Sequence, residues 1–168
     1  MLRTVVISAG LSLPSYASEA HNHSHDLHTK PSVESVTLKG AFARATLPNQ
    51  PVGGGFLEIV NNTFSDDRLL AVTTPVARRV EIHEMRMQDD TMKMRALSEG
   101  LRIPAGETVT LQPGGYHLMF FDLDEPLVQG ESFKAKLYFE KAGAVTVRFE
   151  IRSTNAKPVD HAVHGHGS

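Results

Sequence analysis

The 168-residue sequence predicts an all-β fold, an antiparallel β-sandwich flanked by two polar tails. Short β-rich segments alternate with turns that contain glycine and proline, a pattern typical of strands joined by tight connections. No stretch has the apolar repeat of a long amphipathic helix. Many short strands within roughly 120 residues indicate a sandwich, and we expect residues 34–152 to form this single domain.

Three strands are expected in the first half of the domain, at residues 36–46, 56–60 and 76–85. Between the first two, residues 48–55 contain two prolines and three consecutive glycines, which predicts a turn. The third strand alternates between apolar and polar side chains. Ile82 and His83 are therefore expected to point to opposite faces of the sheet.

Five further strands are expected in the second half, at residues 92–97, 108–111, 116–123, 133–140 and 145–152. The turns between them contain Pro104-Ala105-Gly106, Pro113-Gly114-Gly115 and Lys141-Ala142-Gly143. Proline and glycine punctuate strands because they favour turn conformations and weaken a central ladder. The order of strands and turns therefore leaves no room for a long helix.

The N-terminus has the pattern of a signal peptide. Met1-Leu2-Arg3 gives a short positive start, residues 4–13 are mostly apolar, and small residues precede cleavage sites after Ala17 or Ala20. We expect residues 1–20 to be removed on export. The apolar run is too short to cross a bilayer as a helix, and we expect no membrane span elsewhere.

Seven of the nine histidines lie outside the predicted strands, in the polar segments 21–33 and 153–168. These segments lack apolar periodicity and are predicted to be disordered. Spaced imidazoles in a flexible chain bind Cu(II), Ni(II) or Zn(II), and Cu(II) stands highest in this series. We expect Cu(II) capture by His21, His23, His25, His28, His161, His164 and His166, with a plain solvated linker or a zinc or nickel scavenger as the alternatives. Cleavage after Ala20 would add an N-terminal Cu(II) chelate that includes the third-position imidazole.

The composition argues against several classes of function. The net charge of −2 does not suit nucleic acid, because phosphate binding needs a basic excess. The absence of cysteine excludes a disulfide framework, a thiolate zinc site and a thiol nucleophile. No nucleophile–base pair or phosphate-binding loop is visible, so we expect a protein that is not an enzyme.

Every methionine except the initiator, and both histidines of the strand-forming region, fall within residues 83–119. A generic core would use methionine as a scattered gap-filler. Side chains two residues apart on a strand share a face, so His117 and Met119 point together, as do Met92 and Met94. Three strand ends would then converge on one metal ion.

The donor types indicate which ion. Thioether sulfur is a soft ligand that selects Cu(I) over hard cations, and imidazole also suits copper. A blue-copper electron-transfer centre needs a cysteine thiolate, and zinc sites use cysteine, histidine and carboxylate. Two nitrogen and two sulfur donors without charge suit a Cu(I) ion that is held reversibly.

These residues resemble the periplasmic PCuAC copper chaperone family. The family pattern is a histidine, ten residues, a methionine, about twenty-two residues and then His-x-Met, and it falls here on His83, Met94, His117 and Met119. The adjoining Pro113-Gly114-Gly115-Tyr116 turn also matches, and the resemblance covers residues 36–151. It implies a Greek-key, cupredoxin-like β-sandwich.

The resemblance further implies that those four side chains bind one Cu(I). It implies delivery to the copper-centre subunit of a cytochrome c oxidase, directly or with a thioredoxin-like assembly factor. Some members have methionine directly after the first histidine, where this chain has Glu84, so Met85 is assigned only as an accessory donor. Met92 is a further accessory donor, and Met87 and Met92 are interpreted as alternates or as soft donors that guide transfer.

We expect a monomer. One alternative is a periplasmic copper-buffering or resistance protein without an oxidase partner. The others are a copper-dependent oxidase or monooxygenase and a plain interaction module.

Overall fold

The computed structural model describes residues 35–157, which contain ten strands and no helix, so none that could cross a membrane. The predicted signal peptide and the seven tail histidines lie outside these residues. The all-β class predicted from the sequence is confirmed. The strands are β1 (Val36–Arg44), β2 (Val52–Asn61), β3 (Asp67–Thr73), β4 (Ala77–Gln88), β5 (Thr91–Ala96), β6 (Leu101–Ile103), β7 (Thr108–Leu111), β8 (Tyr116–Leu123), β9 (Ser132–Phe139) and β10 (Gly143–Arg152).

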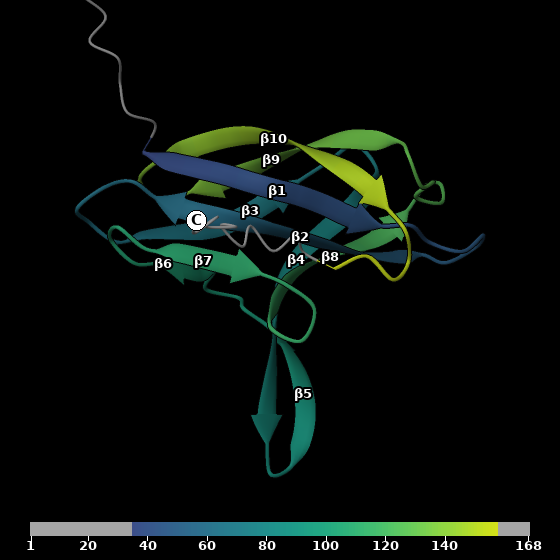
Figure 1. The fold of residues 1–168 in the computed structure, drawn as a ribbon, viewed down its shortest axis with the longest axis horizontal. Coiled ribbons are helices and arrows are strands. Elements are labelled where there is room, and N and C mark those ends of the chain that lie inside the picture. Colours follow the sequence, from purple (N-terminus) through teal and green to yellow (C-terminus); the bar gives the residue numbers. More distant parts are fainter. Residues whose placement is uncertain (1–34, 158–168) are drawn as a thin grey trace, which may run out of the picture. The chain divides into compact units, whose positions relative to one another are not determined.

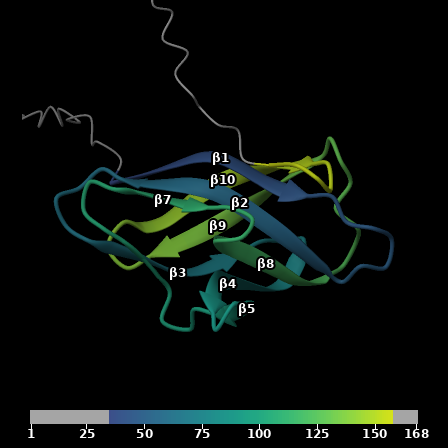
Figure 2. The same cartoon turned by 60° about the horizontal axis from the view of Figure 1, so that its bottom comes forward.

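The strands form one continuous sheet in the order β5-β4-β8-β7-β2-β1-β10-β9-β3-β6, with β8 also paired to β2. The sheet curves so that β8 packs across from β9 and β10 (Figures 1 and 2). Most neighbours are antiparallel, as expected. The exceptions are β1 with β10 and a single contact between β7 and β8, which are parallel.

The core lies between β8 on one side and β9 and β10 on the other. The ring of Phe120 on β8 meets Phe133 and Phe149 edge-on, with centroids 5.4 and 6.0 Å apart. Strand β9 alternates between exposed and buried residues along its whole length, as a strand with one face on a core must. Each large apolar side chain buried in this way contributes about 1.5–3 kcal/mol of stability. These rings and the buried side chains of β9 form the core between β8 and the hairpin of β9 and β10.

The three glycines predicted as part of a turn lie instead inside β2, so that prediction was wrong. Gly53, Gly54 and Gly55 pair with Phe120, Met119 and Leu118 of β8. A Cβ atom on Gly55 would lie 2.6 Å from the ring of Phe120. Gly55 is thus required by the close approach of a core aromatic ring rather than by a turn.

Two strands were not expected from the sequence, β3 and the three-residue β6. Strand β3 begins with Asp67-Arg68, which reads as a polar loop. Asp67 is nevertheless buried, because its carboxylate accepts the backbone N–H groups of Lys141 and Ala142, both at 2.9 Å. These hydrogen bonds to the turn between β9 and β10 offset the cost of burying the charge of Asp67.

Strands β4 and β5 form a hairpin that extends away from the rest of the sheet (Figure 1). Its two-residue turn is Asp89-Asp90, and both residues have positive φ, 48° and 59°, the conformation of a type I′ turn. We call residues 83–96 the methionine hairpin, because they carry four methionines. All six residues of β5 are exposed.

Candidate metal centre

The strand register places the predicted donors on one face. His83 of β4 lies directly opposite His117 of β8, and directly opposed residues of an antiparallel pair share a face. Met119 lies on the same face as His117, and Met85 and Met94, which oppose each other, lie on the same face as His83. Three strands therefore present histidine and methionine side chains together.

The reverse face of the same strands is the core. Ile82 and Leu118 oppose each other one position away from the histidine pair, and both are buried. A slip of one residue in this register would exchange the two sets of side chains. Burial of Ile82 and Leu118 thus determines that the donors face outward.

The two imidazoles are neighbours and are shielded from water. Their ring centroids lie 5.7 Å apart with an interplanar angle of 50°, and each histidine is only 7% exposed. The sulfur of Met94 lies 3.3 Å from Nε2 of His117. Met94 itself is 51% exposed, so this thioether reaches the centre from the solvent side.

A backbone carbonyl orients the ring of His117. Nδ1 of His117 donates to the carbonyl oxygen of Gly115 at 3.0 Å, and the same oxygen accepts the backbone N–H of Met85 at 3.0 Å. Because Nδ1 carries the hydrogen, Nε2 keeps its lone pair, and it faces the sulfur of Met94. This is the arrangement in which imidazole binds metals.

A carboxylate orients the ring of His83 in the same way. Nε2 of His83 donates to Oε2 of Glu81 at 2.7 Å, and Glu81 is in turn paired with Arg79, whose guanidinium lies 4.1 Å from the ring centre of Phe121. Nδ1 of His83 is then the free nitrogen. It is buried without a hydrogen-bond partner, the one such side-chain atom among residues 35–157. An unsatisfied buried nitrogen costs about 1–3 kcal/mol, which a metal ion would recover.

Burial keeps both rings neutral. The pKa of His83 is lowered from its ordinary value, first by desolvation and then by the positive charge of Arg79. The pKa of His117 is also lowered, mainly by desolvation, although the hydrogen bond to Gly115 opposes this shift and His83 adds to it. Both imidazoles are therefore unprotonated at neutral pH, as a metal ligand must be.

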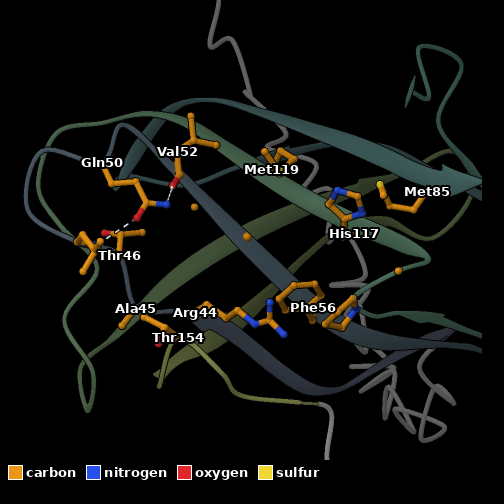
Figure 3. A pocket seen from close by; sticks show the side chains of 15 residues that line it. Arg44, Ala45, Thr46, Gln50, Val52, Phe56, Met85, His117, Met119 and Thr154 are labelled. Carbon is orange, nitrogen blue, oxygen red and sulfur yellow. Dashed lines mark hydrogen bonds between the residues drawn. The ribbon is translucent and has the colours of Figure 1, made fainter. Parts of the chain in front are cut away.

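A groove of about 700 Å³ leads away from the centre. Figure 3 shows Met85 beside His117 on its wall, Met119 further along, and Arg44 across from them. Gly54 is the direct partner of Met119, so the position opposite that thioether on β2 carries no side chain. Gly54, Phe56 and Met119 all line the groove.

The structure brings His83, His117 and Met94 together, places Met119 on the same face, and puts Met85 beside His117. Met87 and Met92 lie further out on the hairpin. Glu81, Arg79 and Gly115 were given no role from the sequence. The alternation of Glu81 with His83 was the available signal for the first of these. Within residues 35–157, no three His, Asp or Glu side chains gather as a metal site; the donors around the imidazoles are thioethers.

The fold and this face define a cupredoxin-like domain with a histidine–methionine centre, and the fold expected from the PCuAC resemblance is confirmed. It is shared with the copper-bound PCuAC domain from PmoF2, which is 24% identical and has a TM-score of 0.60 over 71% of this chain and 93% of that domain. Apo-DR1885 from Deinococcus radiodurans is 23% identical, with a TM-score of 0.56 over 86% of this chain and 97% of that protein.

Residues 36–151 match the family described as "Putative lipoprotein LpqE-like", and the chain belongs to this family. A relative from Leifsonia xyli subsp. xyli (strain CTCB07), described as "Putative lipoprotein Lxx21020", is 31% identical over 119 residues, which are 71% of this chain and 70% of the relative.

Proposed function

We propose that this protein is a copper chaperone that holds one Cu(I) ion through His83, Met94, His117 and Met119 and passes it on. The observation that carries the proposal is the pairing of His83 with His117. Each ring has one nitrogen engaged by a fixed acceptor and one nitrogen left with a lone pair, and the sulfur of Met94 lies 3.3 Å from one of these. Such a donor set fits Cu(I) and no hard cation.

The exposure of the ligands supports transfer rather than catalysis. The histidines are shielded, whereas Met94 is half exposed and is carried by a hairpin that extends from the sheet. A recipient can therefore displace one neutral thioether first, without unfolding the domain and without reprotonating a thiolate. Copper is in this view the cargo of the protein.

The relatives support the same metal. The domain from PmoF2 is described as copper-bound, and DR1885 is described with Cu(I) as well as without metal. We extend this property to the present chain because the donors of its spaced motif converge on one face. We propose that the recipient is the copper-centre subunit of a cytochrome c oxidase, reached directly or through a thioredoxin-like factor.

The place of action follows from two features. The family and the Leifsonia relative are both described as lipoproteins, and residues 1–20 have the pattern of a signal peptide. Both support export, and we propose the periplasm. There the tail histidines would collect Cu(II) independently of the core centre.

The test is an anaerobic Cu(I) titration of the full chain against a chromophoric Cu(I) chelator. We expect one tightly held Cu(I), with affinity reduced by more than about 100-fold in His117→Ala and clearly reduced in Met119→Leu. His166→Ala is the control and should leave this affinity unchanged. Equal affinity in all four proteins would contradict the proposed centre.

A further inference from the structure

The outer part of the methionine hairpin carries a second pair of thioethers. Met85 opposes Met94, and Met87 opposes Met92 two positions nearer the turn. All four side chains lie on the face that carries His83, because alternate residues of a strand share a face. The hairpin therefore presents methionine side chains along one face, from near its turn to the histidine pair.

Core packing does not explain why methionine occupies positions 87 and 92, which we call the outer pair. Met87 is 61% exposed and Met92 is 44% exposed, and neither belongs to the hydrophobic core nor packs against it. The opposite face of the hairpin carries the charged side chains Glu84, Arg86, Lys93 and Arg95, with Glu84 and Arg95 paired at 2.7 Å. The methionine face is thus apolar and sulfur-rich, yet no element of the described residues covers it.

Met94 connects the outer pair to the centre. Its sulfur contacts Nε2 of His117 at 3.3 Å, and its position on β5 is two residues from Met92. The turn residues Asp89 and Asp90 fix the register of these pairs through their positive φ values. Met94 therefore lies between the outer methionine pair and the histidine pair.

We infer that Met87 and Met92 form a second, weaker Cu(I) site, at which Cu(I) enters and leaves the histidine–methionine centre. The inference rests on the proposed function. Two neutral thioethers hold Cu(I), with Met94 as a third donor, and transfer is ligand exchange. On entry the Cu–S bonds to Met87 and Met92 break as bonds to the histidine nitrogens and to the sulfur of Met119 form, while the bond to Met94 is kept; release reverses these changes. The ion stays Cu(I) throughout, and no electron or proton is transferred.

The experiment uses the full chain with ¹³C-methyl-labelled methionine and anaerobic titration with Cu(I). Methyl resonances report sulfur coordination directly and do not respond to metal held by the histidine tails. The first equivalent is expected to shift the Met94 and Met119 methyls. Further Cu(I) is expected to shift the Met87 and Met92 methyls, with a dissociation constant at least tenfold weaker.

Two double variants separate sulfur coordination from a packing role. Met87→Leu with Met92→Leu keeps an apolar pair of similar volume but removes both sulfurs, whereas Met87→Ala with Met92→Ala removes both sulfur and packing. If the sulfurs matter, both double variants keep the first Cu(I), lose the second and release Cu(I) to the chelator several-fold more slowly. Release at the parent rate from the leucine variant, or unshifted Met87 and Met92 methyls, would overturn the inference.

The same methyl shifts distinguish a failure of the proposed function from a failure of the second site alone. Cu(I) that leaves the Met94 and Met119 methyls unshifted would refute the core centre, whatever happens at the outer pair. Shifts of Met94 and Met119 alone would preserve the chaperone proposal and refute only the second site. Thermal midpoints of the variants, measured without metal, show that the hairpin is folded in each comparison.

Discussion

Replacement of Glu81 by glutamine tests how far a residue that does not bind the metal controls the centre. The Glu81 carboxylate accepts Nε2–H of His83 at 2.7 Å and is paired with Arg79. Glutamine keeps the size of the side chain but loses the charge, and its amide can also present a donor to the ring. We expect the tautomer with a free Nδ1 to lose its preference and the lone pair on that atom to become less available.

The magnitude follows from the exposure of the carboxylate. A hydrogen bond to a charged group is worth about 1.5–3 kcal/mol when it is well shielded. The Glu81 side chain is 30% exposed while that of His83 is 9% exposed, so solvent screening reduces this value to about 1–2 kcal/mol. We therefore expect the Cu(I) affinity of E81Q to fall by about 5- to 30-fold.

The assay is competition for Cu(I) with a chromophoric chelator, with Glu84→Gln as the matched control. Glu84 is on the same strand, but it points to the opposite face and pairs with Arg95. The control should bind Cu(I) as the parent does. An E81Q affinity within twofold of the parent, or an equal loss in both variants, would refute the positioning role of Glu81.

Three further outcomes are expected. Gly55→Ala should lower the free energy of unfolding by about 1–3 kcal/mol, because its Cβ would overlap the ring of Phe120, and a lower thermal midpoint would show this. Asp67→Asn should cost about 1–3 kcal/mol in urea denaturation, because one of the two carboxylate oxygens that accept backbone N–H groups becomes an NH₂ donor, and an unchanged midpoint would contradict this role. The metal-free protein should lose stability as the pH falls below about 6.5, because the unfolded chain takes up protons that His83 and His117, with lowered pKa values, resist in the fold. The loss between pH 7 and pH 5.5 should be smaller in a variant with glutamine at both positions; an equal loss would mean that other groups cause it.

Local patterns in the sequence predicted much of the centre. The alternation of side chains along a strand placed His117 with Met119 and separated His83 from Ile82, as the structure shows. The spacing of histidines and methionines along the chain indicated His83, Met94, His117 and Met119 as the candidate ligands. These predictions succeeded because they depend on the pleat of one strand at a time.

Other features depend on pairing between distant segments, which no local pattern contains. The direct opposition of His83 and His117 requires the register of β4 on β8, and the contact of Met94 with His117 requires the β4–β5 turn. The three glycines of β2 were misassigned because the ring of Phe120, which requires a glycine at Gly55, comes from another strand. Strand β3 was missed because its buried Asp67 is satisfied by backbone groups more than seventy residues away.

The separation of the two faces of β4 and β8 means that folding and metal binding use different side chains. Ile82 and Leu118 complete the apolar interior, while His83 and His117 stand on the reverse side. In a zinc finger the metal is needed to form the native state, whereas here the hydrophobic core includes none of the four proposed ligands. We therefore expect the chain to fold and to resist proteases whether or not it holds an ion.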